Sequence, residues 1–407
     1  MTKPIYLDHA ATTPLDSQVL EAMLPYLKEN FGNPGSIYAT GRKSKEAVEN
    51  ARSTVSQTLN CKYSEIIFTG SGTESDNLAI LGTIRHMRKF LKKEPQDLHI
   101  ITTTIEHDAV LQPFKNLEKE GYKVTYLKTD KYGLITPETL EQALTPETVF
   151  ISIMYANNEV GTIEPIKELA KTAHAHENAY KQPVVFHTDA CQAAGSLTLD
   201  IQELGIDLLT LNGSKAYGPK GVGVLYKATH VRLEPITFGG GQESGLRSGT
   251  ENVANIVGIA TALTLAEQNR TQESARLTTL RDKLIKGIEN LIPRVLLNGH
   301  RTQRLPNNIN MLILDIEGEA LLLYLDDKGI EASTGSACHS KNLDPSHVLM
   351  AIGLPEDAVH GSIRFTLGKS TTDADIDKVL EILPAIVEKL REISPIKIND
   401  KILKSRK

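Results

Sequence analysis

Between residues 44 and 226, short apolar runs alternate regularly with longer amphipathic stretches. The apolar runs have the length of β-strands, and seven of them occur: EIIFTG (65–70), HIITTT (99–104), KVTYL (123–127), VFISIM (149–154), VVFHTD (184–189), DLLTLN (207–212) and GVGVLY (221–226). Strands that alternate with helices are typical of a mainly parallel sheet covered by helices. The sequence therefore predicts an α/β fold built on one seven-stranded sheet.

The pattern changes after a glycine-rich segment, FGGGQESGLRSGT, at residues 238–250. A long helical pattern follows from about residue 252 to 291. Three further strand-length runs then precede a closing helical pattern near residues 373–391: NNINMLIL (307–314), GIEAST (329–334) and GSIRFTLG (361–368). These elements predict a second, smaller α+β domain.

We place the boundary between the two domains near residue 265. The large domain is expected to cover residues 15–264, and the small domain residues 1–14 and 265–395. The remaining residues, 396–407, are rich in lysine and poor in apolar groups, so we expect a solvated, frayed tail.

Composition excludes several classes of protein. Lysine and arginine (45) are outnumbered by aspartate and glutamate (50), and the net charge of -5 disfavours a nucleic-acid binder. The three cysteines, Cys61, Cys191 and Cys338, show no paired spacing, which favours a reducing compartment. No apolar run approaches the ~18 residues of a membrane span, and Asp8 and His9 interrupt any signal-peptide core. We expect a soluble, cytoplasmic protein.

Chemistry-bearing residues follow the predicted strands where ligands of open α/β sheets bind, beyond the carboxyl ends. The turn TGSGTESDN places Gly72 and Thr73 at the start of a helix, where backbone N–H groups can bind a phosphate. An ordinary helix cap is the alternative. His107 and Asn158 follow the next strands, and such a histidine alone is more often a surface or core residue.

Asp189 and Lys215 follow two further strands of the predicted sheet. A buried ion pair would explain them, but pyridoxal phosphate explains them together with His107 and the glycine turn. This cofactor needs a lysine for its Schiff base, a carboxylate for its pyridine nitrogen, a ring that stacks on it and an anion cradle. The twelve histidines show no HExxH or comparable spacing, so no resident metal is predicted.

Ten motifs in order carry a family resemblance: YLDHAATTP, GNPGS, FTGSGTESDN, IEH, NNEVGT, DACQ, GSKAYGPKG, GGGQESGLRSGT, STGSACHS and SIRFTLG. In these motifs the chain resembles cysteine desulfurases of the IscS/NifS class, which are class V aminotransferase-like enzymes of fold-type I. The match extends from residue 5 to about 395. The fold it implies has a large cofactor-binding domain with a seven-stranded, mainly parallel sheet and a smaller α+β domain.

The resemblance implies a role for each matching residue in binding pyridoxal 5'-phosphate. Lys215 forms the Schiff base, Asp189 pairs with the pyridinium nitrogen, and Gln192 with the phenolic oxygen. His107 stacks on the ring and helps to shuttle protons. The residues implied at the phosphate are Gly72, Thr73, Asn212, Ser214 and, from the neighbouring subunit, Thr250. The residues implied at the substrate are Asn158, which also lies near the cofactor ring, Arg364, which binds its carboxylate, and Asn33.

Cys338 lies among small and turn residues in ASTGSACHSKNLDPS, which predicts a mobile loop. The resemblance makes it the persulfide carrier and allows it to ligate a transferred iron-sulfur cluster. Cys61 and Cys191 lie beside apolar strands and are expected to be core residues. The family usually has histidine where this chain has Ser214, and threonine where it has His339.

We therefore expect a homodimeric enzyme that converts L-cysteine to L-alanine and supplies sulfur to an iron-sulfur scaffold or a tRNA-thiolation relay. An aminotransferase or a selenocysteine lyase on the same fold is the nearest alternative, although transamination needs no cysteine on a loop. A non-catalytic sulfur-carrier subunit is the alternative from another class. Lys215 argues against that reading, because such a subunit would not need it.

Overall fold

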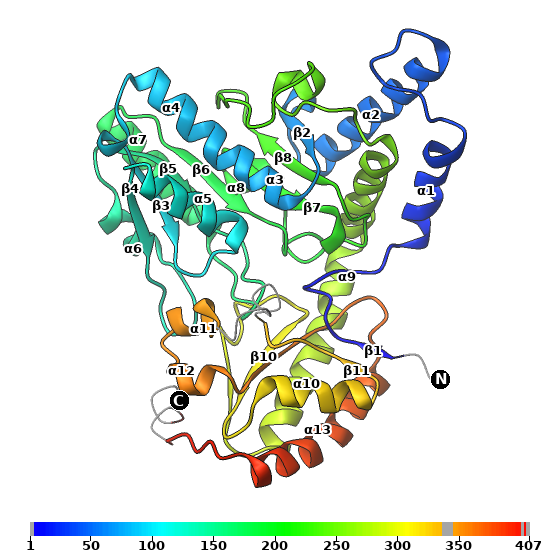
Figure 1. The fold of residues 1–407 in the computed structure, drawn as a ribbon, viewed down its shortest axis with the longest axis vertical. Coiled ribbons are helices and arrows are strands. Elements are labelled where there is room, and N and C mark those ends of the chain that lie inside the picture. Colours follow the sequence, from blue (N-terminus) through cyan, green and yellow to red (C-terminus); the bar gives the residue numbers. More distant parts are fainter. Residues whose placement is uncertain (1–3, 336–344, 400–402, 404–407) are drawn as a thin grey trace.

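The computed structural model describes residues 4–335, 345–399 and 403, arranged as two lobes (Figure 1). The predicted Cys338 and His339 lie outside the described residues. The upper lobe in Figure 1 contains a large sheet with helices, and the lower lobe contains the C-terminal elements. The long helix α9 (Val253–Leu291) runs from one lobe into the other.

The large lobe is built on the predicted seven-stranded sheet, with strand order β2-β8-β7-β6-β5-β3-β4. The strands are β2 (Ile66–Thr69), β3 (His99–Thr103), β4 (Lys123–Leu127), β5 (Thr148–Ser152), β6 (Val185–Asp189), β7 (Leu208–Asn212) and β8 (Gly223–Lys227). Only β8 runs antiparallel to its neighbours. The prediction of a mainly parallel sheet is confirmed.

Helices cover this sheet, and β2, β3, β5 and β6 are buried along their whole length. Burial on both faces explains why these strands appear in the sequence as continuous apolar runs. The helices of the large lobe are α1 (Ser17–Lys28), α2 (Ala39–Thr58), α3 (Gly72–Asn77), α4 (Thr83–Leu91), α5 (Asp108–Lys119), α6 (Pro137–Ala143), α7 (Ile166–Tyr180) and α8 (Ile201–Leu204). Shorter helical turns are η1 (Tyr63–Glu65), η2 (Leu78–Gly82), η3 (Pro95–Asp97), η4 (Gly213–Lys215) and η5 (Gln242–Gly245).

The small lobe contains a three-stranded antiparallel sheet of order β12-β10-β9 and a separate parallel pair, β1 with β11. Its strands are β1 (Ile5–Tyr6), β9 (Val295–Leu297), β10 (Asn308–Ile313), β11 (Ile330–Glu331) and β12 (Ser362–Thr366). Its helices are α10 (Gly318–Asp327), α11 (His347–Ala351), α12 (Glu356–Val359) and α13 (Asp373–Ile393). None of the described helices is long and apolar enough to span a membrane.

Helix α9 belongs to both lobes. Its first half contributes Ile259 and Leu263 to the core of the large lobe, and its second half contributes Leu284 and Ile288 to the core of the small one. The expected boundary at 264/265 thus falls inside a continuous helix. We propose that the chain divides there, with residues 15–264 in one domain and 1–14 with 265–395 in the other.

The described part of the basic tail is held against the small lobe. The backbone of Ile398 donates to Asp315 Oδ1 at 2.8 Å and accepts from Arg294 Nη2 at 2.7 Å. Ile398 and Leu403 also pack against an apolar cluster that includes Val348. The expectation of a solvated tail from residue 396 therefore does not hold at Ile398 and Leu403, because two apolar side chains anchor it.

Candidate active site

A cavity of about 230 Å³ lies where the loops that follow β2, β3, β5, β6 and β7 meet the small lobe. Nine of the residues predicted for the site line it: Gly72, Thr73, His107, Asn158, Asp189, Gln192, Asn212, Lys215 and Arg364. Two larger clefts, of about 670 and 580 Å³, contain none of these residues. The ends of these strands therefore bring side chains from distant parts of the sequence to one cavity.

The remaining predicted residues lie elsewhere. Asn33 is exposed and its Oδ1 accepts a hydrogen bond from Gly35 N at 2.8 Å, within its own turn. Thr250 is exposed, and Ser214 is half-buried behind the cavity wall. Gly335, which precedes Cys338 by three residues, lines the cavity and is the last described residue before the gap.

The turn between β2 and α3 forms one wall of the cavity. Ser71 caps the helix by accepting a hydrogen bond from Glu74 N at 3.1 Å, and Glu74 in turn accepts from Gly70 N at 2.7 Å. A Cβ at Gly72 would approach Cys191 Sγ to 2.9 Å, so a larger residue would clash. Gly72 and Thr73 thus begin α3 with first-turn N–H groups that lack intrahelical acceptors.

Asn212 lies across from this turn, and Ser214 fixes its orientation. Asn212 Oδ1 accepts hydrogen bonds from the backbone N–H of Ser214 at 3.0 Å and from Ser214 Oγ at 3.1 Å. The amide nitrogen of Asn212 then lies on the side of Gly72, where it can donate. Ser214 therefore contacts the cavity through Asn212 rather than directly.

Asp189 and Lys215 sit at the ends of β6 and β7. Asp189 is buried, and its Oδ1 accepts from Cys191 N at 2.9 Å. Lys215 Nζ donates to the carbonyl oxygens of Ala10 at 2.7 Å and Ala11 at 2.5 Å. The amine of Lys215 is thus held at the cavity by the N-terminal segment.

His107 is oriented by the start of α5. Its Nδ1 accepts a hydrogen bond from Ala109 N at 3.1 Å. A backbone N–H can only donate, so the proton of the neutral ring is assigned to Nε2. The imidazole therefore offers a donor on its other edge while its position is fixed.

Two buried carboxyl groups, Asp76 and Glu106, interact electrostatically with Asp189, and Asp76 also lines the cavity. Burial raises the pKa of Asp76 well above its usual range, and the charge of Asp189 raises it further. Burial also raises the pKa of Glu106 to about 8. His187, whose Nε2 is 3.6 Å from Asp76 Oδ1, has its pKa lowered to about 3 by burial. At neutral pH the protonated Glu106 and the neutral His187 add no charge to this region.

Replacing Glu106 by glutamine should remove a pH-dependent loss of stability. Glu106 is protonated in the folded chain up to about pH 8, whereas the unfolded group has a pKa of 4.5. Between these values only the unfolded chain releases the proton, so the native state loses stability as pH rises. We expect the stability of Glu106→Gln relative to the parent to increase by about 3 to 4 kcal/mol between pH 5 and pH 8.

Thermal unfolding at both pH values measures this difference. Glu65→Gln is the matched control, since hydrogen bonds from Thr229 and Lys62 outweigh burial and lower the pKa of Glu65. That carboxylate stabilises the fold above its pKa, so its substitution should not give a gain at high pH. A Glu106→Gln difference that stays constant with pH would contradict the assignment.

The two cysteines of the large lobe, Cys61 and Cys191, lie in different surroundings. Cys61 packs against the core, as expected, and burial raises its pKa to about 12. Cys191 was expected in the core but lines the cavity beside Gly72, because the loop after β6 turns toward α3. Burial, followed by the charges of Asp189 and Asp76, raises the pKa of Cys191 well above its usual range. It is therefore a neutral thiol and a poor nucleophile.

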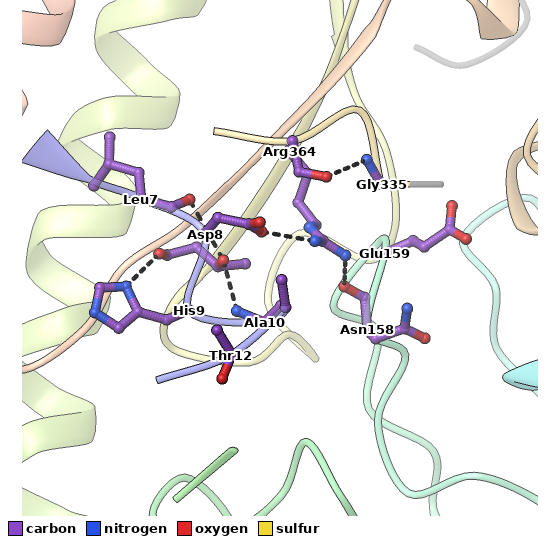
Figure 2. Close-up of polar contacts among 12 residues, drawn as sticks. Leu7, Asp8, His9, Ala10, Thr12, Asn158, Glu159, Gly335 and Arg364 are labelled. Carbon is purple, nitrogen blue, oxygen red and sulfur yellow. Dashed lines mark hydrogen bonds and ion pairs between the residues drawn. The ribbon is translucent and has the colours of Figure 1, made fainter. Parts of the chain in front are cut away.

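Arg364 enters the cavity from β12 and is nearly covered, with 3% of its side chain exposed. Its guanidinium donates to Asp8 Oδ1 at 2.8 Å and to the carbonyl oxygen of Asn158 at 3.0 Å (Figure 2). Its Nε is buried and has no hydrogen-bond partner among the described residues. Asp8 was not predicted as part of the site, although it lies in the motif YLDHAATTP, because its contact with Arg364 joins positions 356 residues apart.

Residues 5–379 match the family described as aminotransferase class V, and fold and site together define a member of this pyridoxal phosphate-dependent family. The cysteine desulfurase IscS of Dictyoglomus turgidum is 49% identical over 404 residues, which cover 99% of this chain and 100% of the relative. The chain belongs to the cysteine desulfurases of this family.

Solved structures show the same relationship. A NifS-like protein superposes with a TM-score of 0.86 at 35% identity, covering 95% of this chain and 100% of its own. A structure described as SspA in complex with cysteine has a TM-score of 0.76 at 35% identity and covers 89% of this chain and 98% of its own.

Proposed function

We propose that this desulfurase converts L-cysteine to L-alanine in the 230 Å³ cavity and leaves the sulfur as a persulfide on Cys338. The observation that carries the proposal is the meeting of Lys215, Asp189 and Arg364 at this one cavity. An amine, a carboxylate and a guanidinium there match the needs of an amino acid bound to pyridoxal phosphate. One solved neighbour is described as a complex with cysteine, which supports the choice of substrate.

The residues that line the cavity fit the cofactor chemically. Lys215 would hold it covalently, Asp189 would pair with its ring nitrogen, and Gln192 with its phenolic oxygen. The close approach that only glycine permits at Gly72 leaves room beside Thr73 and Asn212 for a phosphate group. When bound, pyridoxal phosphate supplies an electron sink for the charge that develops at the substrate α-carbon.

The chain's own side chains would orient the substrate and move its protons. Arg364 would bind the α-carboxylate, with Asn158 beside it and Asn33 in support. The Lys215 amine, placed by the carbonyls of Ala10 and Ala11, would take the α-proton. His107 would stack on the ring and donate or accept a proton.

The sulfur-transfer step balances without an outside oxidant. The Cys338 thiolate attacks the substrate sulfur, an S–S bond forms, and the C–S bond of the substrate breaks. The substrate carbon gains a proton and leaves as alanine, while Cys338 carries the extra sulfur. This role of Cys338 is supported by Gly335, which lines the cavity and precedes Cys338 by three residues in the sequence.

We further propose a homodimer in which Thr250 completes the phosphate site of the neighbouring subunit. Thr250 is exposed and therefore available for such a contact. Two large apolar side chains of the large lobe are also exposed in the single chain, Phe238 at 82% and Ile37 at 88%. Burying such apolar surface is a normal role of a subunit interface.

The persulfide sulfur would pass to an acceptor protein, either an iron-sulfur scaffold or a tRNA-thiolation relay, and Cys338 could ligate a transferred cluster.

Incubation of the holoenzyme with L-cysteine tests the reaction itself. The proposal expects L-alanine and enzyme-bound sulfur in equal amounts. A 2-oxo acid in place of alanine would instead indicate transamination.

Ser214→Ala should weaken cofactor binding by about three- to tenfold, since it removes one of two hydrogen bonds that orient Asn212. The backbone N–H of residue 214 retains the other bond, so binding should persist. Equilibrium titration of the apoprotein with pyridoxal phosphate measures the effect. The exposed Ser64 provides the matched control, Ser64→Ala, and equal affinities for the two variants would exclude this role of Ser214.

A further inference from the structure

The N-terminal segment, residues 8–13, contacts several residues of the proposed site. It runs from β1 in the small lobe to α1 in the large lobe (Figure 1). Its carbonyl groups accept hydrogen bonds from Lys215 and from Gln192 Nε2, the latter at 3.1 Å to Ala10. At its end, Thr13 N donates to Ser214 O at 2.9 Å. The segment is therefore a wall of the site.

This segment is held in place from both sides. His9 Nδ1 lies 2.9 Å from Thr366 O, and Ala10 N donates to Thr366 Oγ1 at 2.9 Å (Figure 2). The Tyr6 hydroxyl lies within hydrogen-bond distance of the carbonyls of Asp8, at 2.9 Å, and Thr12, at 2.8 Å. These contacts fix the backbone of Asp8 against β12.

Asp8 reaches from this fixed backbone to Arg364. The carboxylate, with 18% of its side chain exposed, accepts from a guanidinium that is 3% exposed. Asp8 does not line the cavity, whereas Arg364 does. Any effect of Asp8 on a ligand must therefore act through the position and charge of Arg364.

The ion pair has two opposing consequences for a substrate carboxylate. The hydrogen bond orients the guanidinium, so that its unpartnered Nε and the remaining N–H groups keep a constant direction. The negative charge of Asp8 also cancels part of the positive charge that attracts an anion. A carboxylate that binds Arg364 therefore contacts a guanidinium whose orientation is fixed but whose electrostatic attraction is reduced by Asp8.

We propose that Asp8 is a positioning and specificity-determining residue that limits the affinity of Arg364 for carboxylates. This inference rests on the proposed function, in which Arg364 binds the substrate carboxylate. A carboxylate alone then binds weakly, and tight binding requires an amino group that is also held in the cavity. The pocket thereby favours α-amino acids over other small thiol acids.

Asp8→Asn separates charge from orientation, because the amide oxygen can still accept from Arg364. We expect the KM for L-cysteine to fall about three- to tenfold, the range for one partly screened unit charge, with kcat within about twofold. Calorimetric titration with 3-mercaptopropionate, which has the carboxylate and the thiol but no amine, should show a similar gain in affinity. The KM for L-cysteine methyl ester, which has no carboxylate charge, should not change.

Asp16→Asn is the matched control, since Asp16 forms an ion pair with Lys369 at 2.7 Å further along the chain. The same loss of charge there should leave the KM and the calorimetric affinity unchanged. If Asp8→Asn does not fold, as judged by circular dichroism, Asp8→Ser provides the neutral comparison.

Unchanged or weakened binding of 3-mercaptopropionate by the neutral variant would overturn the inference. An equal shift with the methyl ester would also overturn it, because the effect would not depend on the carboxylate. A parent enzyme that forms no alanine would refute the proposed function instead. Calorimetry would still report the effect of Asp8 on carboxylate binding in that case.

Discussion

Replacing Lys215 by alanine is expected to lower the rate of alanine formation by at least about 10³-fold, because the variant loses both the covalent attachment of the cofactor and the group that moves the α-proton. The visible absorbance of the lysine-bound cofactor should disappear as well. Lys215→Arg should be equally inactive, although it can donate to the Ala10 and Ala11 carbonyls, since a guanidinium stays protonated.

The control is Lys220→Ala, which removes an exposed lysine from the turn that follows. It should keep the absorbance and the rate of the parent. If the Lys215→Ala enzyme retained the absorbance and turned over L-cysteine, another amine would hold the cofactor and the proposed site would be wrong.

Replacing Cys338 by alanine or serine should have a comparably large effect on a different step. Alanine release should fall by roughly 10³-fold, since the attacking nucleophile is missing. Cofactor absorbance and the spectral response to L-cysteine should remain, because neither requires the thiol. In the parent, the rate should rise with pH through the neutral range toward the thiol pKa of about 8.5.

Cys61→Ala is the matched control, because Cys61 packs against the core away from the cavity. It should retain the parent rate at temperatures where it remains folded. If the Cys338 variants released alanine at the parent rate, the persulfide would have to form on another residue. Cys191 would then be the first candidate for the persulfide carrier. That outcome would contradict our inference that its raised pKa keeps the thiol neutral and a poor nucleophile.

The large sheet could be predicted because most of its strands are buried on both faces and leave uninterrupted apolar runs. Strands β1 and β9 of the small lobe could not. β9 has three residues and β1 has two, too few to show an alternation. β11 pairs with β1, more than three hundred residues earlier, and no local pattern indicates that pairing. The anchored Ile398 was missed because the lysines around it dominate the composition.

In the candidate site, side chains that follow strands could be expected to lie close together, since parallel strands bring their carboxyl ends to one edge. Asp189, Asn212 and Lys215 meet at the cavity for this reason. The contacts of Lys215 with the carbonyls of Ala10 and Ala11 could not be predicted, because every residue has a backbone carbonyl and the residue type does not show which one binds. The hydrogen bond from Ser214 Oγ to Asn212 could not be predicted, because it depends on local torsion angles that the residue type does not determine. The contact of Asp8 with the site could not be predicted, because its partner Arg364 is 356 positions away in the sequence.

The most direct test of the central claim is the mass of the peptide that contains Cys338 after the holoenzyme reacts with L-cysteine in the absence of reductant. The account predicts one added sulfur atom on Cys338, an amount of L-alanine equal to that sulfur, and no added sulfur on Cys61 or Cys191. L-Alanine formed while Cys338 remains unmodified, or with the sulfur on Cys191, would contradict it.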